Sequence, residues 1–428
     1  MVKRVYDFTE GSKEMRALLG GKGANLAEMT SLGLSIPPGF TITTETCIDF
    51  FDAGGKLPEG TWEEVLEHVK KLEEKTGKRF NDKESPLLVS VRSGAPVSMP
   101  GMMDTVLNLG LNDEISEAMV SLTGDERFVY DAYRRLITMF SDVVMYQERH
   151  EFEEVFNAVK KKEGVTADTD VSIDGLKETV KGMKALYREL LDEDFPQDPL
   201  VQLERAISSV FNSWNIPRAI NYRKYEGIPN DMGTASNVQT MVFGNMGWDS
   251  GSGVLFTRSP SDGSKGLYGE LLFNAQGEDV VAGIRTPIHL EDLNDEQPEL
   301  YTELEEISEK VEQHYKDMQD MEFTIEQGKL WILQTRTGKR TARAAIKIAV
   351  DMKKEGLIDI ETAIKRIRPQ DVDQLLHPQF DPDAIDEATE LATGLNASPG
   401  AAVGKAIFDA DRAEEIGKGG QDVILVRP

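Results

Sequence analysis

The chain has 428 residues, a length that favours roughly two to four domains over a single compact one. Its formal net charge of −27 argues against a nucleic-acid partner, because phosphate backbones need a basic surface. No apolar run is typical of a signal peptide or long enough to span a membrane. Cys47 is the only cysteine, which rules out an intramolecular disulfide and favours a reducing cytoplasm.

The first candidate site is the glycine turn Gly20-Gly21-Lys22-Gly23, which precedes a predicted helix that Gly33 ends. Glycines let backbone amides approach a phosphate closely, and a helix N-terminus adds a favourable dipole. Lys22 would supply positive charge. The motif lacks the Ser or Thr that follows the lysine of a Walker A loop. A plain tight turn with a solvated lysine explains the pattern equally well.

A buried-type strand at 86–91 runs directly into Arg92. An arginine at the end of a buried strand can place a fixed guanidinium where it forks onto phosphate oxygens. The alternative is a structural arginine paired with one of the many carboxylates.

The loop that follows, from Met99 to Thr105, combines glycine, flexible methionines and a hydroxyl, which suits a lid over a nucleotide. A methionine-rich loop packed on a core would look the same.

Between about 112 and 212 apolar residues recur at helical spacing, which predicts a helical subdomain inserted between sheet-forming parts. The predicted helices cover 125–147, 150–162, 173–192 and 199–212. Strand character returns at 234–243, 253–258 and 269–283, and an acidic helix follows at 300–318. On the strand at 234–243, Gln239 could contact an adenine edge or could equally face solvent.

A hairpin is predicted from Met321–Glu326 and Leu330–Arg336, with a turn at Gln327-Gly328. Asp320 and Glu322 are two residues apart on an extended segment, so their carboxylates share a face, as do Gln334 and Arg336 on the return strand. Two carboxylates and an amide oxygen suit Mg²⁺ that bridges nucleotide phosphates, and Arg336 could meet phosphate charge. An ordinary hairpin with an Arg336–Glu322 salt bridge is the open alternative.

The C-terminal part begins with a basic, then apolar helix at 338–356, which we interpret as a connector. His377 is interpreted as a linker residue, and the five histidines show no zinc-ligand spacing. The acidic segment at 381–390 is expected to be mobile. Two strand-like runs at 402–408 and 422–427 are too few to close a domain, so we expect a truncated unit there.

Taken together, these segments resemble pyruvate, phosphate dikinase along essentially the whole chain. The resemblance is carried by 20–29 (Gly-Gly-Lys-Gly-Ala-Asn-Leu-Ala-Glu-Met), 89–112, 274–283, 318–326 and Gln334-Thr335-Arg336. Related ATP-grasp phosphotransferases such as phosphoenolpyruvate synthase share the Lys, Arg and Gln-Thr-Arg elements. They usually have a Gln-Gln pair where this chain has Met102-Met103, and the run Pro-Gly-Met-Met-Asp-Thr is specific for the dikinase.

The resemblance implies roles for matching positions. Lys22, Arg92 and Arg336 would contact ATP phosphates during phosphoryl transfer. The lid would consist of Gly101, Met102, Met103, Asp104 and Thr105. Gln239 would lie by the adenine, with Glu278 and Arg218 near the site or a docking face. Asp320, Glu322 and Gln334 would organise Mg²⁺.

The family converts ATP, phosphate and pyruvate into AMP, pyrophosphate and phosphoenolpyruvate through a swivelling phosphohistidine domain. Its Thr-Ser-His motif does not occur in this sequence, so we expect an ATP-binding portion without the transferring histidine or the pyruvate site. Alternatives are a phosphoenolpyruvate synthase-like enzyme and a non-catalytic nucleotide-binding module.

The expected fold class is α+β. An ATP-grasp nucleotide-binding domain would span 1–340, with its helical subdomain at 112–197. A helical linker (341–392) and the beginning of the phosphohistidine domain (393–428) would follow. Expected partners are ATP, phosphate and the phosphohistidine domain of a longer, homodimeric protein, with no nucleic acid and no membrane.

Overall fold

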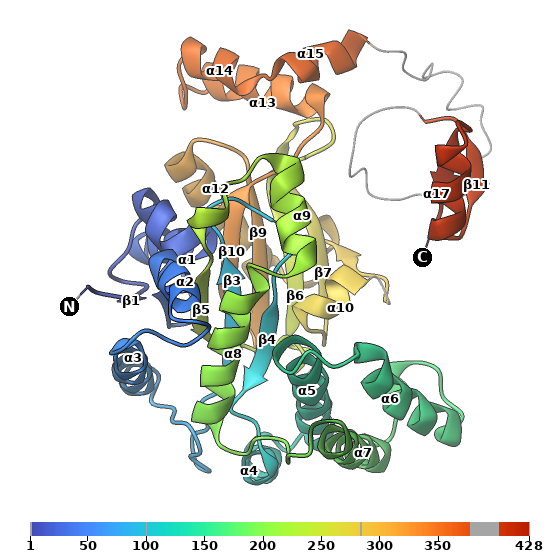
Figure 1. Ribbon diagram of the computed structural model, residues 1–428. Helices are drawn as coiled ribbons and strands as arrows, with labels where there is room; N and C mark the ends of the chain where they lie inside the picture. Colours follow the sequence, from blue (N-terminus) through green and yellow to red (C-terminus); the bar gives the residue numbers. More distant parts are fainter. Residues whose placement is uncertain (1, 100, 283–284, 377–401, 428) are drawn as a thin grey trace. The chain divides into compact units, whose positions relative to one another are not determined.

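The computed structural model describes residues 2–99, 101–282, 285–376 and 402–427, and it divides into two units. The first unit comprises 1–251 and 324–335, and the second comprises 252–323 and 336–428. Both mix helices with sheets, as an α+β chain should (Figure 1). The predictions for His377 and for the acidic segment 381–390 lie outside the described residues. In the described part, no helix is both long and apolar enough to cross a membrane.

The first unit contains a five-stranded sheet in the order β1-β2-β5-β3-β4, and each neighbouring pair is antiparallel. Its strands are β1 (Val5–Asp7), β2 (Gly39–Ile42), β3 (Val89–Gly94), β4 (Thr105–Leu109) and β5 (Ala235–Thr240). Its helices are α1 (Arg16–Ser31), α2 (Thr44–Asp52), α3 (Thr61–Thr76), α4 (Asp113–Thr123), α5 (Glu126–Met139), α6 (Arg149–Glu163), α7 (Ile173–Leu191), α8 (Pro199–Ser213) and α9 (Pro217–Glu226).

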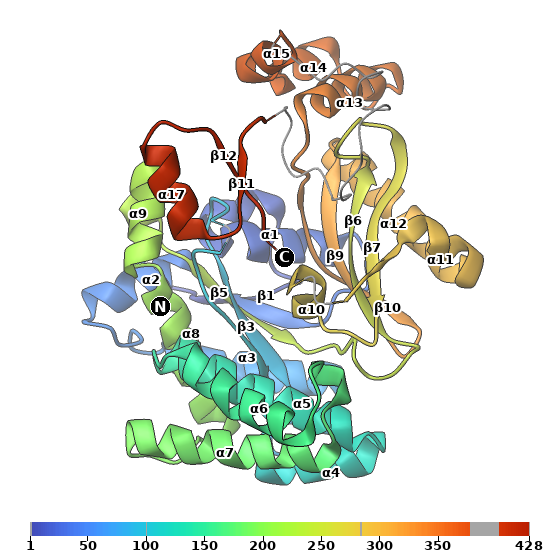
Figure 2. The same ribbon diagram turned by 90° about the vertical axis from the view of Figure 1, so that its right-hand side faces the viewer.

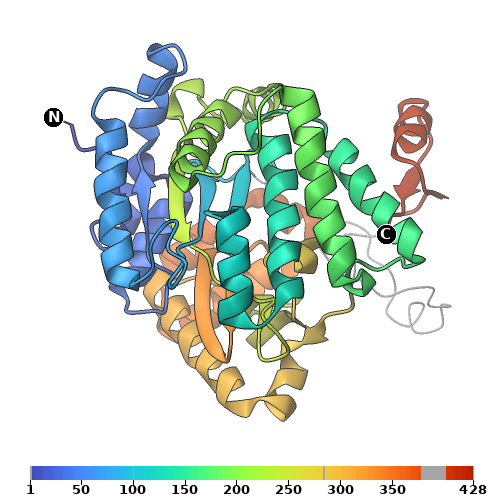
Figure 3. The ribbon, with the colours of Figure 1, turned by 90° about the horizontal axis from the view of Figure 1, so that it is seen from below.

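The two faces of this sheet differ because side chains alternate along each strand. Val89, Val91 and Val238 are fully buried in the main core, against helices that include α5 and α8. Helix α1 covers the opposite, more polar face, where Gly23 lies against Thr41 and Asn237. The predicted helices are confirmed, and α5, α6 and α7 pack side by side (teal and green in Figure 3).

The second sheet has the order β10-β9-β6-β7-β8 (Figure 2). Its strands are β6 (Gly251–Arg258), β7 (Lys265–Phe273), β8 (Ile288–His289), β9 (Gln319–Glu326) and β10 (Lys329–Thr337). The accompanying helices are α10 (Gly277–Ala282), α11 (Leu290–Glu296), α12 (Pro298–Tyr315), α13 (Ala342–Lys354), α14 (Ile360–Arg366) and α15 (Pro369–Leu376). Met318, Ile348 and Met352 belong to another hydrophobic core, in which α13 packs against the rest of the second unit.

The predicted hairpin is confirmed as β9 and β10, joined at Gln327-Gly328. The prediction of strand across 269–283 is correct only as far as Phe273, because Gly277–Ala282 forms α10. The side chain of Asp279 accepts a hydrogen bond from the backbone amide of Gln276 (3.0 Å). The backbone amide of Asp279 donates to the backbone carbonyl of Gln276 (2.9 Å). These local bonds close a helical turn at the start of α10.

The last described segment, 402–427, contains β11 (Lys405–Ile407), α17 (Ala410–Lys418) and β12 (Val423–Leu425). The two strands pair in parallel, with Lys405 opposite Val423. A parallel pair needs a crossover connection, and α17 supplies it. Both strand-like runs predicted here are therefore strands.

Candidate nucleotide-binding site

The glycine segment Gly20–Gly23 lies inside α1, where Gly20 breaks the helical geometry, and not in a turn before the helix as predicted; it packs directly on the end of β3. Gly20 has a φ of +68°, and a Cβ added there would lie 1.6 Å from the carbonyl oxygen of Gly94. The amide of Gly21 donates to the carbonyl of Ala95 at 2.9 Å. A Cβ added to Gly94 would in turn lie 3.2 Å from the Cβ of Lys22. Only glycine allows this approach, and it sets Lys22 beside the strand that carries Arg92.

Arg92 belongs to a row of residues that crosses four strands of the sheet. The register places Thr41 opposite Asn237, Asn237 opposite Arg92, and Arg92 opposite Thr105. Residues directly opposite each other share a face, so all four lie on the face that α1 covers. The Thr41 hydroxyl donates to Asn237 Oδ1 at 2.8 Å, and Asn237 Nδ2 donates to the Arg92 carbonyl at 3.2 Å. Sequence reasoning missed Thr41 and Asn237, although Asn237 lies on the strand predicted at 234–243.

A second bond from α1 reaches the Gln-Thr-Arg segment of β10. Asn25 Nδ2 donates to the carbonyl oxygen of Thr335 at 2.8 Å, and both residues belong to the first unit. Thr335 lies between Gln334 and Arg336 in the sequence. The hydrogen bond ties two motifs that are 310 residues apart. Asn25 lies inside the Gly-Gly-Lys-Gly-Ala-Asn motif, but the sequence alone predicts no role for it.

The methionine loop connects β3 to β4. Gly101 has a φ of +70° with open space around it, whereas Met102 and Met103 are half-buried against the main core. Thr105 is the first residue of β4, so it belongs to the sheet and lies opposite Arg92. The loop therefore combines an exposed glycine with methionines that pack on the core.

Asp104 closes this loop with an ion pair to Arg218 on α9. Burial raises the pKa of the Asp104 carboxyl above its ordinary value, although the Arg218 charge opposes the rise. Two residues that the resemblance assigned separately, one to the lid and one to the site or docking face, are therefore in direct contact. Sequence spacing gives no sign of this pair, because its members are 114 positions apart.

Gln239 is 2 % exposed and its Nε2 donates to the carbonyl of Pro37 at 3.1 Å. The alternative that Gln239 faces solvent is therefore wrong. Its strand neighbours, Ser90 and Gly39, share its face of the sheet. Glu278, by contrast, is an exposed residue of α10 in the second unit.

The paired acids of β9 have the predicted alternation. Met321, Phe323 and Ile325 are buried on one face, while Asp320 and Glu322 lie on the other. Arg336 Nε donates to Asp320 Oδ2 at 2.7 Å, so the salt bridge considered from the sequence forms with Asp320.

The electrostatics of Asp320 favour a cation. Burial raises the pKa of the Asp320 carboxyl, and the charge of Glu322 adds to the rise, whereas Arg336 opposes it. A divalent cation would offset that unfavourable burial of negative charge. Mg²⁺ commonly takes one or two carboxylates and completes its shell with water and phosphate oxygens. The carboxylates of Asp320 and Glu322 therefore have the chemistry that Mg²⁺ requires. No cluster of three or more His, Cys, Asp or Glu side chains suited to a metal occurs among the described residues.

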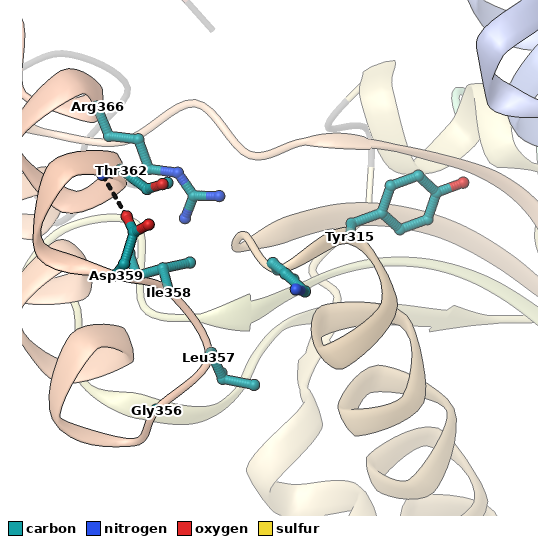
Figure 4. Close-up of a pocket in the computed structure, with 8 residues that line it drawn as sticks. Tyr315, Gly356, Leu357, Ile358, Asp359, Thr362 and Arg366 are labelled. Atoms are coloured by element: carbon teal, nitrogen blue, oxygen red, sulfur yellow. Dashed lines mark hydrogen bonds between the residues drawn. The ribbon is translucent and has the colours of Figure 1, made fainter.

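One further cavity, of about 520 Å³, lies in the second unit between the end of α12 and the loop before α14 (Figure 4). Two of its charged side chains have protein partners. Asp359 accepts from the Thr362 amide at 2.7 Å, and Arg366 contacts Asp317 at 3.5 Å.

The first unit carries the glycine segment Gly20–Gly23 and Arg92, which lies inside β3 and not at its end as predicted, and the second unit carries the paired acids Asp320 and Glu322. Elements of these kinds are typical of nucleotide-binding phosphotransferase domains. A family model described as "Pyruvate phosphate dikinase, AMP/ATP-binding domain" matches residues 16–61, 54–300 and 288–357. The chain belongs to this family, and the resemblance stated from its motifs is confirmed.

Similar curated proteins bear the name of pyruvate, phosphate dikinase. The protein of Clostridium symbiosum is 54 % identical over 428 residues, which cover 100 % of this chain and 49 % of the relative. The chloroplastic proteins of Mesembryanthemum crystallinum and Oryza sativa subsp. japonica are 55 % and 56 % identical, covering 100 % and 99 % of this chain and 45 % of each relative. The chain thus spans about half the length of the curated relatives it matches.

Proposed function

We propose that this chain binds MgATP as the nucleotide-binding part of a pyruvate, phosphate dikinase. The whole protein would convert ATP, phosphate and pyruvate into AMP, pyrophosphate and phosphoenolpyruvate through a phosphohistidine. The observation that carries the proposal is the close approach of Gly20 to Gly94, which sets Lys22 beside the strand that carries Arg92. Relatives named pyruvate, phosphate dikinase, 54–56 % identical over the chain, support it.

The proposed roles follow from charge and position. Lys22 and Arg92 would bind the triphosphate, with Arg336 as a third cation. Gly101, Met102, Met103, Asp104 and Thr105 would cover the nucleotide, with Gln239 and Glu278 as additional nucleotide contacts. Asp320, Glu322 and Gln334 would hold Mg²⁺, which when bound neutralises charge on phosphate oxygens. The residues of this chain would bind and orient the triphosphate for in-line attack by a histidine of another domain.

The finer architecture belongs to the same proposal. We assign an ATP-grasp nucleotide-binding domain to 1–340, with a helical subdomain at 112–197. A helical linker would span 341–392, and the phosphohistidine domain would begin within 393–428. Phosphate, the phosphohistidine domain and a second copy of a longer protein are the proposed partners. Cys47 is buried, and burial raises the pKa of its thiol to about 12. The location we expect for the protein is the cytoplasm.

Isothermal titration of the chain with MgATP tests the proposal. Loss of one charge-assisted contact in Arg92→Ala should weaken binding about 10- to 100-fold. Arg188→Ala is the matched control, because Arg188 is exposed and pairs only with exposed Asp194 among the described residues. Absence of binding by the parent chain, or equal binding by Arg92→Ala and Arg188→Ala, would refute the assignment of this site.

A turnover assay of the whole protein tests the reaction. Phosphate-dependent formation of pyrophosphate is expected for a dikinase. ATP-dependent phosphoenolpyruvate formation without a phosphate requirement would instead identify a phosphoenolpyruvate synthase-like enzyme.

A further inference from the structure

An arginine in the second unit is fully buried, and its guanidinium connects two helices. Arg258, the last residue of β6, donates to Glu312 on α12 through Nε (3.0 Å) and Nη2 (2.7 Å). It donates to Glu355, which follows α13, through Nη1 (3.0 Å) and Nη2 (2.6 Å). All three of its nitrogens are therefore used. Its hydrogen bonds are also the main reason why the pKa of Glu355 lies below its ordinary value.

The same network reaches the start of β9 through a hydroxyl group. Thr257 Oγ1 donates to Glu312 Oε2 at 2.7 Å and accepts from the backbone amide of Gln319 at 3.0 Å. A hydroxyl has one proton, so donation to the carboxylate commits its oxygen to accept from the amide. Gln319 directly precedes Asp320. The series guanidinium, carboxylate, hydroxyl and amide thus ends one residue before the paired acids.

Such a network is a costly way to gain stability alone. Buried ion pairs lose much of their attraction to desolvation, and well-packed apolar residues often serve stability as well or better. What a saturated network does supply is fixed geometry, because every donor and acceptor in it has one partner arrangement. The element whose geometry it fixes here is the beginning of strand β9 (Figure 2). Asp320 and Glu322 belong to this strand.

We propose that Arg258 is a positioning residue for the paired acids. Through Glu312 and Thr257 it fixes the start of β9, and so the direction of Asp320 and Glu322. Through Glu355 it also links the position of β9 to the position of helix α13. The inference rests on the proposed function, in which these two carboxylates hold Mg²⁺ with the nucleotide.

The direct test uses Thr257, because removing a buried arginine would leave carboxylates unpaired and endanger the fold. Thr257→Val removes the hydroxyl at nearly constant volume, and Thr257→Ser retains it. Titrations with MgATP and with ATP in EDTA are compared. Loss of this hydrogen-bond relay should weaken MgATP binding about 3- to 10-fold in Thr257→Val. Binding of metal-free ATP should change less than twofold, and Thr257→Ser should resemble the parent.

The link to α13 has its own variant. Glu355→Gln keeps the size of the side chain but removes its charge, and it should weaken MgATP binding in the same selective manner. Glu361→Gln is the matched control, because Glu361 is exposed on α14 and pairs with Lys365. If Thr257→Val does not fold, Glu355→Gln decides the question.

The outcomes separate the two proposals. Asp320→Asn should lose the Mg²⁺-dependent part of ATP binding. If it does so while Thr257→Val and Glu355→Gln bind MgATP as the parent does, the positioning role is wrong and the site assignment stands. A parallel loss of MgATP and metal-free ATP binding would reduce Arg258 to a purely structural residue. If Asp320→Asn binds MgATP like the parent, the proposal that the paired acids hold Mg²⁺ is wrong, and the positioning role that rests on it is wrong as well.

Discussion

Glycine at position 20 meets two separate demands, a left-handed backbone and an absence of side chain. Gly20→Ala should therefore lower the free energy of unfolding by roughly 2–4 kcal/mol, the sum of a left-handed penalty and steric displacement. Gly33→Ala is the matched control, since Gly33 has a φ of +72° but nothing within 4 Å. Gly33→Ala should cost only about 1 kcal/mol. Urea denaturation of both variants provides the measurement, and equal losses would contradict the close contact at Gly94.

Asp320 predicts a pH dependence of metal-linked binding. Its pKa is raised, so the folded chain binds a proton there more tightly than the unfolded chain does. This group therefore favours the folded state at low pH, and the contribution is lost as pH rises through the raised pKa. Protonation would also displace Mg²⁺, so MgATP affinity should fall as pH is lowered towards the raised pKa, before ordinary aspartates titrate near 3.8.

Titrations with MgATP at successively lower pH values measure this effect. Asp320→Asn should flatten the profile, because an amide does not titrate in this range. A profile of the same steepness in parent and Asp320→Asn would assign the pH dependence to other groups.

At the scale of elements, the turn between β9 and β10 contains a residue in a disfavoured conformation. Gln327 and Gly328 both have positive φ, +50° and +75°, as a two-residue hairpin of this type requires. Asparagine tolerates this conformation better than glutamine, so Gln327→Asn should raise the free energy of unfolding by about 0.5–1 kcal/mol. Thermal unfolding checks the prediction, with Gln313→Asn on α12 as a control that should give no gain.

The elements also show what sequence reasoning could predict. The β9–β10 hairpin and the helices α5 to α8 have strong local periodicity, and both predictions are correct. Helix α10 was missed because Val280 and its apolar neighbours suggested a strand, whereas the side chain of Asp279 closes a helical turn. The spacing of apolar residues predicts long helices and strands well, but a single side-chain hydrogen bond to the backbone can favour a short helix where the spacing suggests a strand.

The candidate site was predictable only in part. Lys22, Arg92 and the paired acids carry recognisable motifs, and their roles in nucleotide binding stay predictions. The bonds Asn25–Thr335 and Asp104–Arg218 join residues 310 and 114 positions apart. Such contacts depend on how the elements pack, and no local spacing encodes them.

At the scale of the whole molecule, the net charge of −27 predicts a salt effect on stability. Carboxylates that repel one another in a compact chain are relieved when counter-ions screen them. The midpoint of thermal unfolding should therefore rise by a few degrees as NaCl increases from about 0.01 M to about 0.3 M. KCl should act like NaCl if screening is the cause. A midpoint that falls with salt would mean that attractive ion pairs dominate.

The contact between Gly20 and Gly94 has a practical consequence for protein engineering. Main chain meets main chain there, so neither partner has a rotamer with which to adjust to a new neighbour. Grafting the lysine turn into a foreign scaffold would therefore fail unless the segment around Gly94 were transplanted with it. The transferable module is a pair of segments more than 70 positions apart, and libraries that randomise only one of them should yield few functional clones.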